Sequence, residues 1–214
     1  MTVSWNSADK SSNITLSGGS LTATLTSASQ GAVRADTSFA TGKYYFEVEI
    51  SALPGSNWAI GWANSSADLS QPMGGSGTGN DAGAYYPKVD QFVLNNTFLA
   101  SLAQIGYAAI TIGIAFDIDN LLIWYRYANS VWNGGYPLFL QTNDPAASTG
   151  GISLASLNAG PYYPVFSSGD SGAEIVANFG ASNFAYVAPS GFSALDTNVQ
   201  SYLAVPKMLG YGTL

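Results

Sequence analysis

Two pairs of carboxylates stand at alternate positions of segments that are expected to be β-strands. Glu47 and Glu49 form one pair, and Asp117 and Asp119 form the other. Because alternate residues of a strand point to the same face, the members of each pair should lie about 7 Å apart. Paired carboxylates are the groups with which most glycosidases work. The alternative, which we favour, is a solvated sheet face with no catalytic role.

Asp117 and Asp119 also suggest a calcium loop, because Asn120 follows them directly. The further ligands and the distal glutamate of such a loop are missing, so a tight hairpin turn explains the segment better. The chain contains no Cys and no His, which removes thiol nucleophiles, Ser-His-Asp triads and most zinc or iron sites. We therefore expect no catalysis, no bound metal and no cofactor.

Charged residues are scarce, and most of them are acidic. The chain has 6 Lys and Arg against 13 Asp and Glu, which gives a net charge of −7 at pH 7. The basic residues are scattered singly, so binding to nucleic acid or to an anionic membrane is not expected. No run approaches the roughly 18 apolar residues of a membrane helix, so membrane insertion is not expected either. The segment MTVSWNSADK lacks the basic and apolar regions of a secretory signal, which favours a protein that is made in a host cytoplasm and assembled into a virion, or that is otherwise cytoplasmic.

Aromatic side chains are the best candidates for ligand contacts. They make up 13% of the chain, and rings exposed near loops bury a large area at low entropy cost. The expected anchors lie near turns or near Gly- and Pro-rich segments: Trp132, Tyr136, Tyr85, Tyr86 and Tyr162. The alternative is that these rings only cover the ends of the fold. By contrast, Trp58, Trp62 and Trp124 lie within expected strands, which predicts that they are buried.

Arg34 is the remaining candidate for ligand binding. It is one of only two arginines in the chain. In so acidic a protein we expect it to pair with a carboxylate such as Glu47 or Asp36, and a contact with a ligand is the alternative.

Short alternating segments, separated by turn residues, predict an all-β fold. The clearest segment runs from Gly42 to Ile50, and its Tyr45, Glu47 and Glu49 are expected on a wet face. Further strands are expected at 14–17, 21–26, 33–35, 57–63, 110–118, 121–127, 162–166 and 173–179, with a long surface loop over 64–83. This density of strands and turns predicts an antiparallel two-sheet β-sandwich with little helix.

Six pieces of the chain, in order, resemble the SPRY domain family. They are VSWNSADKSSNITLSGGSLTAT (3–24), VRADTSFATGKYYFEVEI (33–50), IGWA (60–63), the hairpin IGIAFDID with IWYRYANSVW (112–132), NFG (178–180) and PSGF (189–192). The opening piece looks like bacterial and phage members. The resemblance implies a jelly-roll-like sandwich that binds and does not catalyse. Related concanavalin-like sandwiches host glycosidases, but the segment FDIDNLLIW lacks both outer residues of their Glu-x-Asp-x-x-Glu pattern.

The resemblance divides the chain into a sandwich over residues 1–194 and an extended arm over 195–214. Large apolar side chains in the arm are expected to be buried, since burying each one is worth about 1.5–3 kcal/mol. They are Tyr202, Leu203, Val205, Met208, Leu209 and Tyr211. We expect the arm to pack on a second copy of the chain or on another virion protein, with docking on its own domain as the alternative.

The expected function is binding, at the loops 64–86, 128–136 and 141–151. The resemblance to phage-type members and the charge-poor surface favour a phage virion component: a tail, fibre or capsid-surface protein for attachment or decoration. Its expected partners are other virion proteins, further copies of itself, and a cell-surface glycan or protein receptor. One alternative is a free cytoplasmic SPRY module that recognises a peptide. The other is a carbohydrate-active enzyme.

Overall fold

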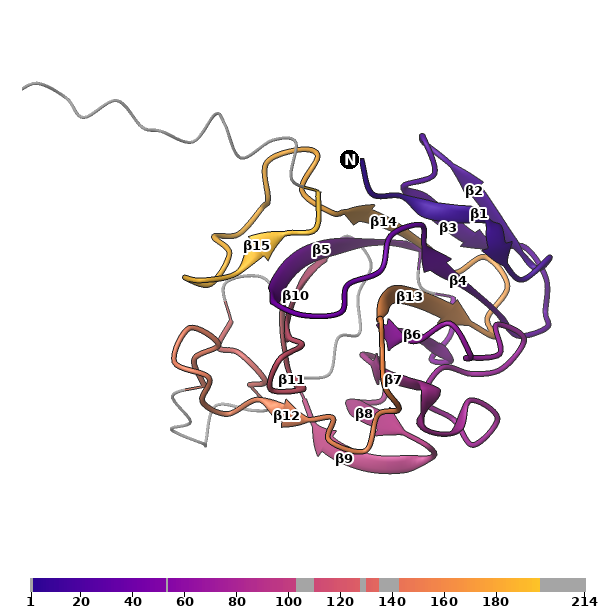
Figure 1. Cartoon of the computed structure of the whole chain (residues 1–214). Coiled ribbons are helices and arrows are strands. Elements are labelled where there is room, and N and C mark those ends of the chain that lie inside the picture. The colour runs from indigo at the N-terminus through magenta and orange to yellow at the C-terminus, as the bar shows by residue number, and fades with distance from the viewer. Residues whose placement is uncertain (1, 53, 103–109, 128–129, 135–142, 197–214) are drawn as a thin grey trace, which may run out of the picture.

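The chain folds into two antiparallel β-sheets that pack face to face (Figure 1). The structure is a computed structural model, and it describes residues 2–52, 54–102, 110–127, 130–134 and 143–196. In that part of the chain the only helical element is the short 3-10 helix η1 (Gly79–Asp81). The predicted all-β, two-sheet sandwich with little helix is confirmed.

The two sheets contain seven and eight strands. The order in the seven-stranded sheet is β1 (Trp5–Lys10), β4 (Gly31–Ala35), β13 (Tyr163–Ser168), β6 (Trp58–Ala63), β7 (Ala82–Tyr86), β8 (Gln91–Leu94) and β9 (Thr97–Ser101). The order in the eight-stranded sheet is β12 (Ile152–Ser153), β11 (Leu122–Tyr127), β10 (Thr111–Asp117), β5 (Lys43–Ala52), β14 (Glu174–Asn178), β3 (Thr22–Leu25) and β2 (Ile14–Ser17). The last strand, β15 (Ser193–Ala194), pairs in parallel with the start of β5.

The strand β5 organises the eight-stranded sheet. It is ten residues long, β10 pairs with its first seven residues, and β14 pairs with its second half. The chain then returns from β10 into β11 through a tight turn, in which Leu121 adopts a φ of 51°. This is the predicted hairpin after Asp117.

Aromatic rings fill the core between the sheets. Trp62 packs on Phe46 and Phe116, with ring centroids 5.8 and 5.0 Å apart. Trp58 lies in the same core and is 1% exposed. Trp124 is also completely buried, but in a smaller cluster on the outer side of the eight-stranded sheet. The predicted burial of these three tryptophans is confirmed.

The outer face of β5 is covered over the first part of the strand, so the prediction that it is wet was wrong for Tyr45 and Glu47. Residues 180–192, which we call the strap, fold back across this face before β15 begins (Figure 1). Tyr45 and Glu47 are therefore 0% and 2% exposed, and the ring of Phe184 lies 4.9 Å from that of Tyr45. Glu49 and Ser51, nearer the far end of β5, are exposed, as was expected of Glu49.

The loop that follows β6 covers the outer face of the seven-stranded sheet. This face is built of small side chains, which leave room for a second layer: Ala32, Ala59, Ala63, Ala82 and Ala84. Ala67 and Met73 of the loop pack against them, and the backbone oxygen of Met73 accepts a 2.8 Å hydrogen bond from Tyr86 Oη. The described loop is therefore a packed layer of the fold.

Candidate functional site

Glu47 anchors the strap. Its carboxylate accepts hydrogen bonds from Tyr45 Oη at 2.7 Å and from the backbone nitrogens of Ala185 and Tyr186 at 2.7 and 2.9 Å. Burial, assisted by the hydrogen bond to Glu47, raises the pKa of Tyr45 far above its usual value. Both oxygens of Glu47 are occupied by donors from the protein itself, so this residue is built to hold the strap and not to exchange protons with a substrate.

Asp117 closes the hairpin between β10 and β11. It forms an ion pair with Lys43 at 2.9 Å and accepts hydrogen bonds from Asn120 N and Nδ2 at 3.1 and 2.8 Å. Asp119 points elsewhere, since its Oδ1 atom accepts a hydrogen bond from the backbone nitrogen of Gly42. Within the described residues no group of three or more metal-binding side chains comes together. The arrangement is that of a hairpin turn.

The electrostatics of Asp117 predict acid sensitivity. Burial acts to raise the pKa of its carboxyl, but the hydrogen bonds from Asn120 and the charge of Lys43 outweigh burial and hold the pKa below its usual value. A carboxyl with a lowered folded-state pKa stabilises the fold above its unfolded pKa of about 3.9, and this stabilisation is lost as the pH falls through the folded-state value. We therefore expect denaturant titrations of Asp117→Asn to lose part of the acid-induced fall in stability that the unchanged chain displays. An identical pH profile in both proteins would contradict this assignment.

The aromatic residues expected to form one binding edge are not brought together. Tyr85 and Tyr162 lie in the core, 2% and 5% exposed, with their rings packed on Tyr125 and Phe116. Their neighbour Tyr86 points to the opposite face of β7, as alternate strand residues must, and burial there raises its pKa to about 12. Tyr85, Tyr86 and Tyr162 are thus parts of the fold, and Tyr136 lies outside the described residues.

Trp132 lies in the loop that follows β11. It is partly buried, and the guanidinium of Arg126 stacks over its ring at 4.4 Å from the centroid. Its neighbour Val131 is 61% exposed. Trp132 and Val131 therefore lie at the rim of the eight-stranded sheet, where β11 continues into the following loop.

Arg34 forms a structural ion pair, although with a different carboxylate from those expected. Its Nε and Nη2 atoms donate to both oxygens of Asp9 on β1, at 2.7 and 2.9 Å. Nη1 donates to the backbone oxygens of Asn64 and Ala67. The guanidinium therefore fastens the covering loop to the sheet. The prediction of Glu47 or Asp36 as its partner was wrong, because β1, not β5, lies beside β4, and because Asp36 accepts hydrogen bonds from Ser4.

The described parts of the other two expected loops are braced against each other. Asn133 accepts a hydrogen bond from the backbone nitrogen of Tyr125 at 2.8 Å, and its Nδ2 atom donates to the backbone oxygen of Gly150 at 2.9 Å. Asn143 Nδ2 donates to the backbone oxygen of Trp132 at 2.8 Å. Residues 130–134 and 143–151 thus meet beside β11 and β12, whereas the loop after β6 lies on a different face.

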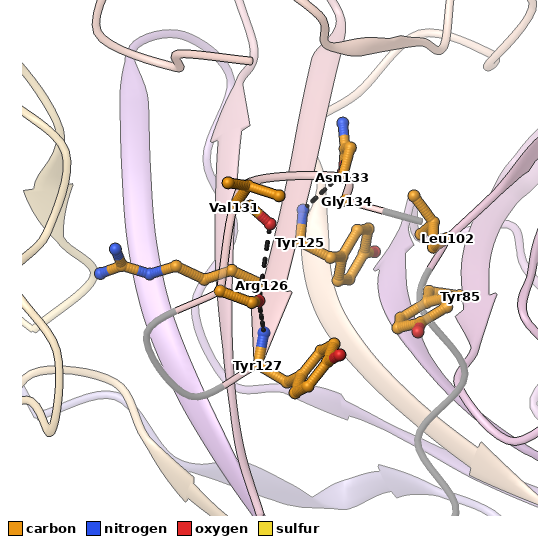
Figure 2. Close-up of a pocket in the computed structure, with 9 residues that line it drawn as sticks. Tyr85, Leu102, Tyr125, Arg126, Tyr127, Val131, Asn133 and Gly134 are labelled. Atoms are coloured by element: carbon orange, nitrogen blue, oxygen red, sulfur yellow. Dashed lines mark hydrogen bonds between the residues drawn. The ribbon is translucent and has the colours of Figure 1, made fainter. Parts of the chain in front are cut away.

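A small pocket lies behind residues 130–134 (Figure 2). Its volume of 10 Å³ is room for about one water molecule. Figure 2 shows the ring of Tyr125 and the side chain of Arg126 leaving β11 on opposite sides, with Tyr85 and Leu102 on the side of the Tyr125 ring. The pocket is too small to hold a ligand.

A larger groove runs along the open side of the sandwich. Its volume is 450 Å³, and we call it the edge groove. The described residues that line it are 99–102 of β9 and its continuation, Asn133 and Asn143 of the braced loops, and 150–153 of β12 and the turn before it. None of these residues is charged. The edge groove is therefore a neutral, partly apolar surface between the outer strands of the two sheets.

The sequence predicted the loops on one side of the edge groove as binding loops, but it did not predict the strand β9 on the other side. The signal available was the uncharged run Thr97–Ser101, in which Phe98 and Leu99 turn out to be 54% and 38% exposed. A strand with two large apolar side chains outside the core is unusual enough to single out.

Two antiparallel sheets packed face to face, with covering layers on both outer faces, define a β-sandwich. The sequence profile of the SPRY domain family matches residues 43–182, and the chain belongs to this family.

Solved structures agree with this assignment at the level of the fold. The SPRY domain of human HERC1 superposes with a TM-score of 0.63 at 12% identity, covering 84% of this chain and 99% of that one. The PSpry domain of TRIM65 gives 0.59 at 15% identity, covering 83% and 92%, and a human SPRY domain gives 0.57 at 15%, covering 81% and 99%. A search of the curated proteins returned no match. Among the described residues, no helix has the length and apolar character needed to cross a membrane.

Proposed function

We propose that the protein is an interaction module that binds a polypeptide segment in the edge groove. SPRY domains generally mediate protein–protein interaction, and the chain belongs to that family. The observation that carries the proposal is the edge groove. It has a volume of 450 Å³, its described lining is uncharged, and the two loops that line one side of it are hydrogen-bonded to each other. Such a preorganised surface binds without first having to order its own loops.

A role without catalysis fits the arrangement of the acids. Glu47 is enclosed by three donors, and Asp117 is neutralised by Lys43, so neither faces a substrate. The carbohydrate-active enzyme is therefore the weakest of the functions considered.

The virion hypothesis has less support than the interaction module. It rested on a resemblance to bacterial and phage members, whereas the structures compared above include SPRY domains of human proteins. The hypothesis of a free module that recognises a peptide is better supported. Location in a virion or in a cytoplasm stays a prediction, as does the binding role of the arm at 195–214, most of which lies outside the described residues. Leu195 and Asp196 are described, and both are buried against the sandwich.

A binding experiment with groove variants tests the proposed function. Peptides would be selected on the purified chain from a random library displayed on phage, and their affinities measured by fluorescence anisotropy. We expect Ser153→Arg, which places a long charged side chain in the edge groove, to weaken binding about tenfold or more. Ser17→Arg on β2, the opposite edge of the same sheet, is the matched control and should bind as the unchanged chain does.

Two outcomes would contradict the proposed function. If the selected peptides bind Ser153→Arg and Ser17→Arg with equal affinity, or if no peptide is selected at all, the edge groove is not the binding surface.

A further inference from the structure

The strands at the two ends of each sheet order differ in how they are protected. Sheet edges carry unpaired backbone groups, and proteins usually guard them with charges, prolines or short strands. The strand β1 ends in Asp9 and Lys10, while β2 and β12 have only four and two residues. The strand β9, with the sequence TFLAS, has five residues, no charge and no proline. Its one protective feature is a bulge, where the register with β8 shifts.

The outer side of β9 is open in the described structure. The strand pairs with β8 on one side, and no described strand pairs with the other. Leu99 and Ala100 line the edge groove, and Ile152 of β12 stands on its far wall. The ring of Phe98 is more than half exposed. Backbone donors and acceptors, an apolar wall and an exposed ring thus lie together along one strand.

We propose that β9 is a site of strand addition, at which an extended segment of a partner protein pairs with Thr97–Ser101 through backbone hydrogen bonds. This proposal rests on the proposed function and specifies how the edge groove is occupied. Backbone pairing supplies affinity in this mode, and alternate side chains of the added strand supply specificity. Because the described lining is uncharged, the segment that fits best is itself uncharged, with apolar side chains at alternate positions that contact Leu99 and Ile152.

The test changes the peptide, so that the protein stays as it is. Each residue of a peptide selected from the phage library would be methylated in turn at its backbone nitrogen, which removes one donor and blocks pairing. If the peptide adds to β9, methylation should weaken binding about tenfold at every second residue and have little effect at the residues between. An even, small effect along the peptide would overturn strand addition. It would leave the proposed function standing if Ser153→Arg still weakens binding.

A pair of variants on the protein side provides an independent check. Leu99→Lys adds the kind of charge that guards natural edges, and it should weaken binding about tenfold without changing the melting temperature, because Leu99 is partly exposed. Val187→Lys, at a side chain 87% exposed on the strap, is the control and should bind normally. Equal binding by both variants would overturn the proposal. So would dimers that form without peptide and disappear in Leu99→Lys, since a second copy of the chain would then be the occupant.

Discussion

Trp62→Ala is expected to remove about 3–5 kcal/mol from the free energy of unfolding. The ring is completely buried and packs on Phe46 and Phe116 between the sheets, so its removal leaves a cavity that the surrounding strands cannot close. Domains of this kind are stable by only about 5–15 kcal/mol, so the variant should be barely folded at physiological temperature. Urea titration followed by circular dichroism measures the loss directly.

Trp132→Ala is the control for this change. Its ring is only partly buried, stacks with Arg126 and meets the edge of the Tyr45 ring at 6.2 Å between centroids, so truncation should cost about 1 kcal/mol. Equal losses from the two variants would mean that Trp132 belongs to the core, and that the rim beside the edge groove has been misplaced.

Glu47→Gln is expected to destabilise the chain by about 2 kcal/mol and to loosen the strap. Three hydrogen-bond donors converge on the carboxylate, and an amide replaces one of its acceptor oxygens with a donor. A buried donor left without an acceptor costs about 1–3 kcal/mol. Hydrogen exchange at Ala185 or at Tyr186 should become faster, because one of these two backbone N–H groups loses its acceptor.

Glu49→Gln offers a close control, two residues along the same strand and on the same face. Its side chain is exposed, so the change should stay within about 0.5 kcal/mol. If the two glutamines have the same effect, Glu47 does not hold the strap.

The pair Glu47 and Glu49 also illustrates what the sequence could and could not predict. The alternation of β5 predicted correctly which residues face the core and which face outward. It could not predict that the strap covers Glu47 and leaves Glu49 exposed, because that contact joins residues 138 positions apart. Local periodicity reports which face a residue takes, and says nothing about what lies over that face.

The spatial neighbours of Arg34 and Tyr85 could not be predicted from the sequence either. The expected partners of Arg34 were near in sequence or on the best-defined strand, whereas the actual partner, Asp9, is set by the order of strands in the sheet. Tyr85 and Tyr86 were expected to act together, but adjacent strand residues must take opposite faces. The fold class followed from strands and turns, while the candidate site depended on which edges remain unpaired.

The most direct test of the central claim is hydrogen exchange, measured by mass spectrometry, with and without a bound peptide from the phage selection. Binding in the edge groove predicts that protection increases at 97–102 and 150–153, and that 14–17 on the opposite edge is unchanged. Protection that appears elsewhere, for example only at the 54–57 and 168–172 turns at another part of the sandwich, would contradict the account.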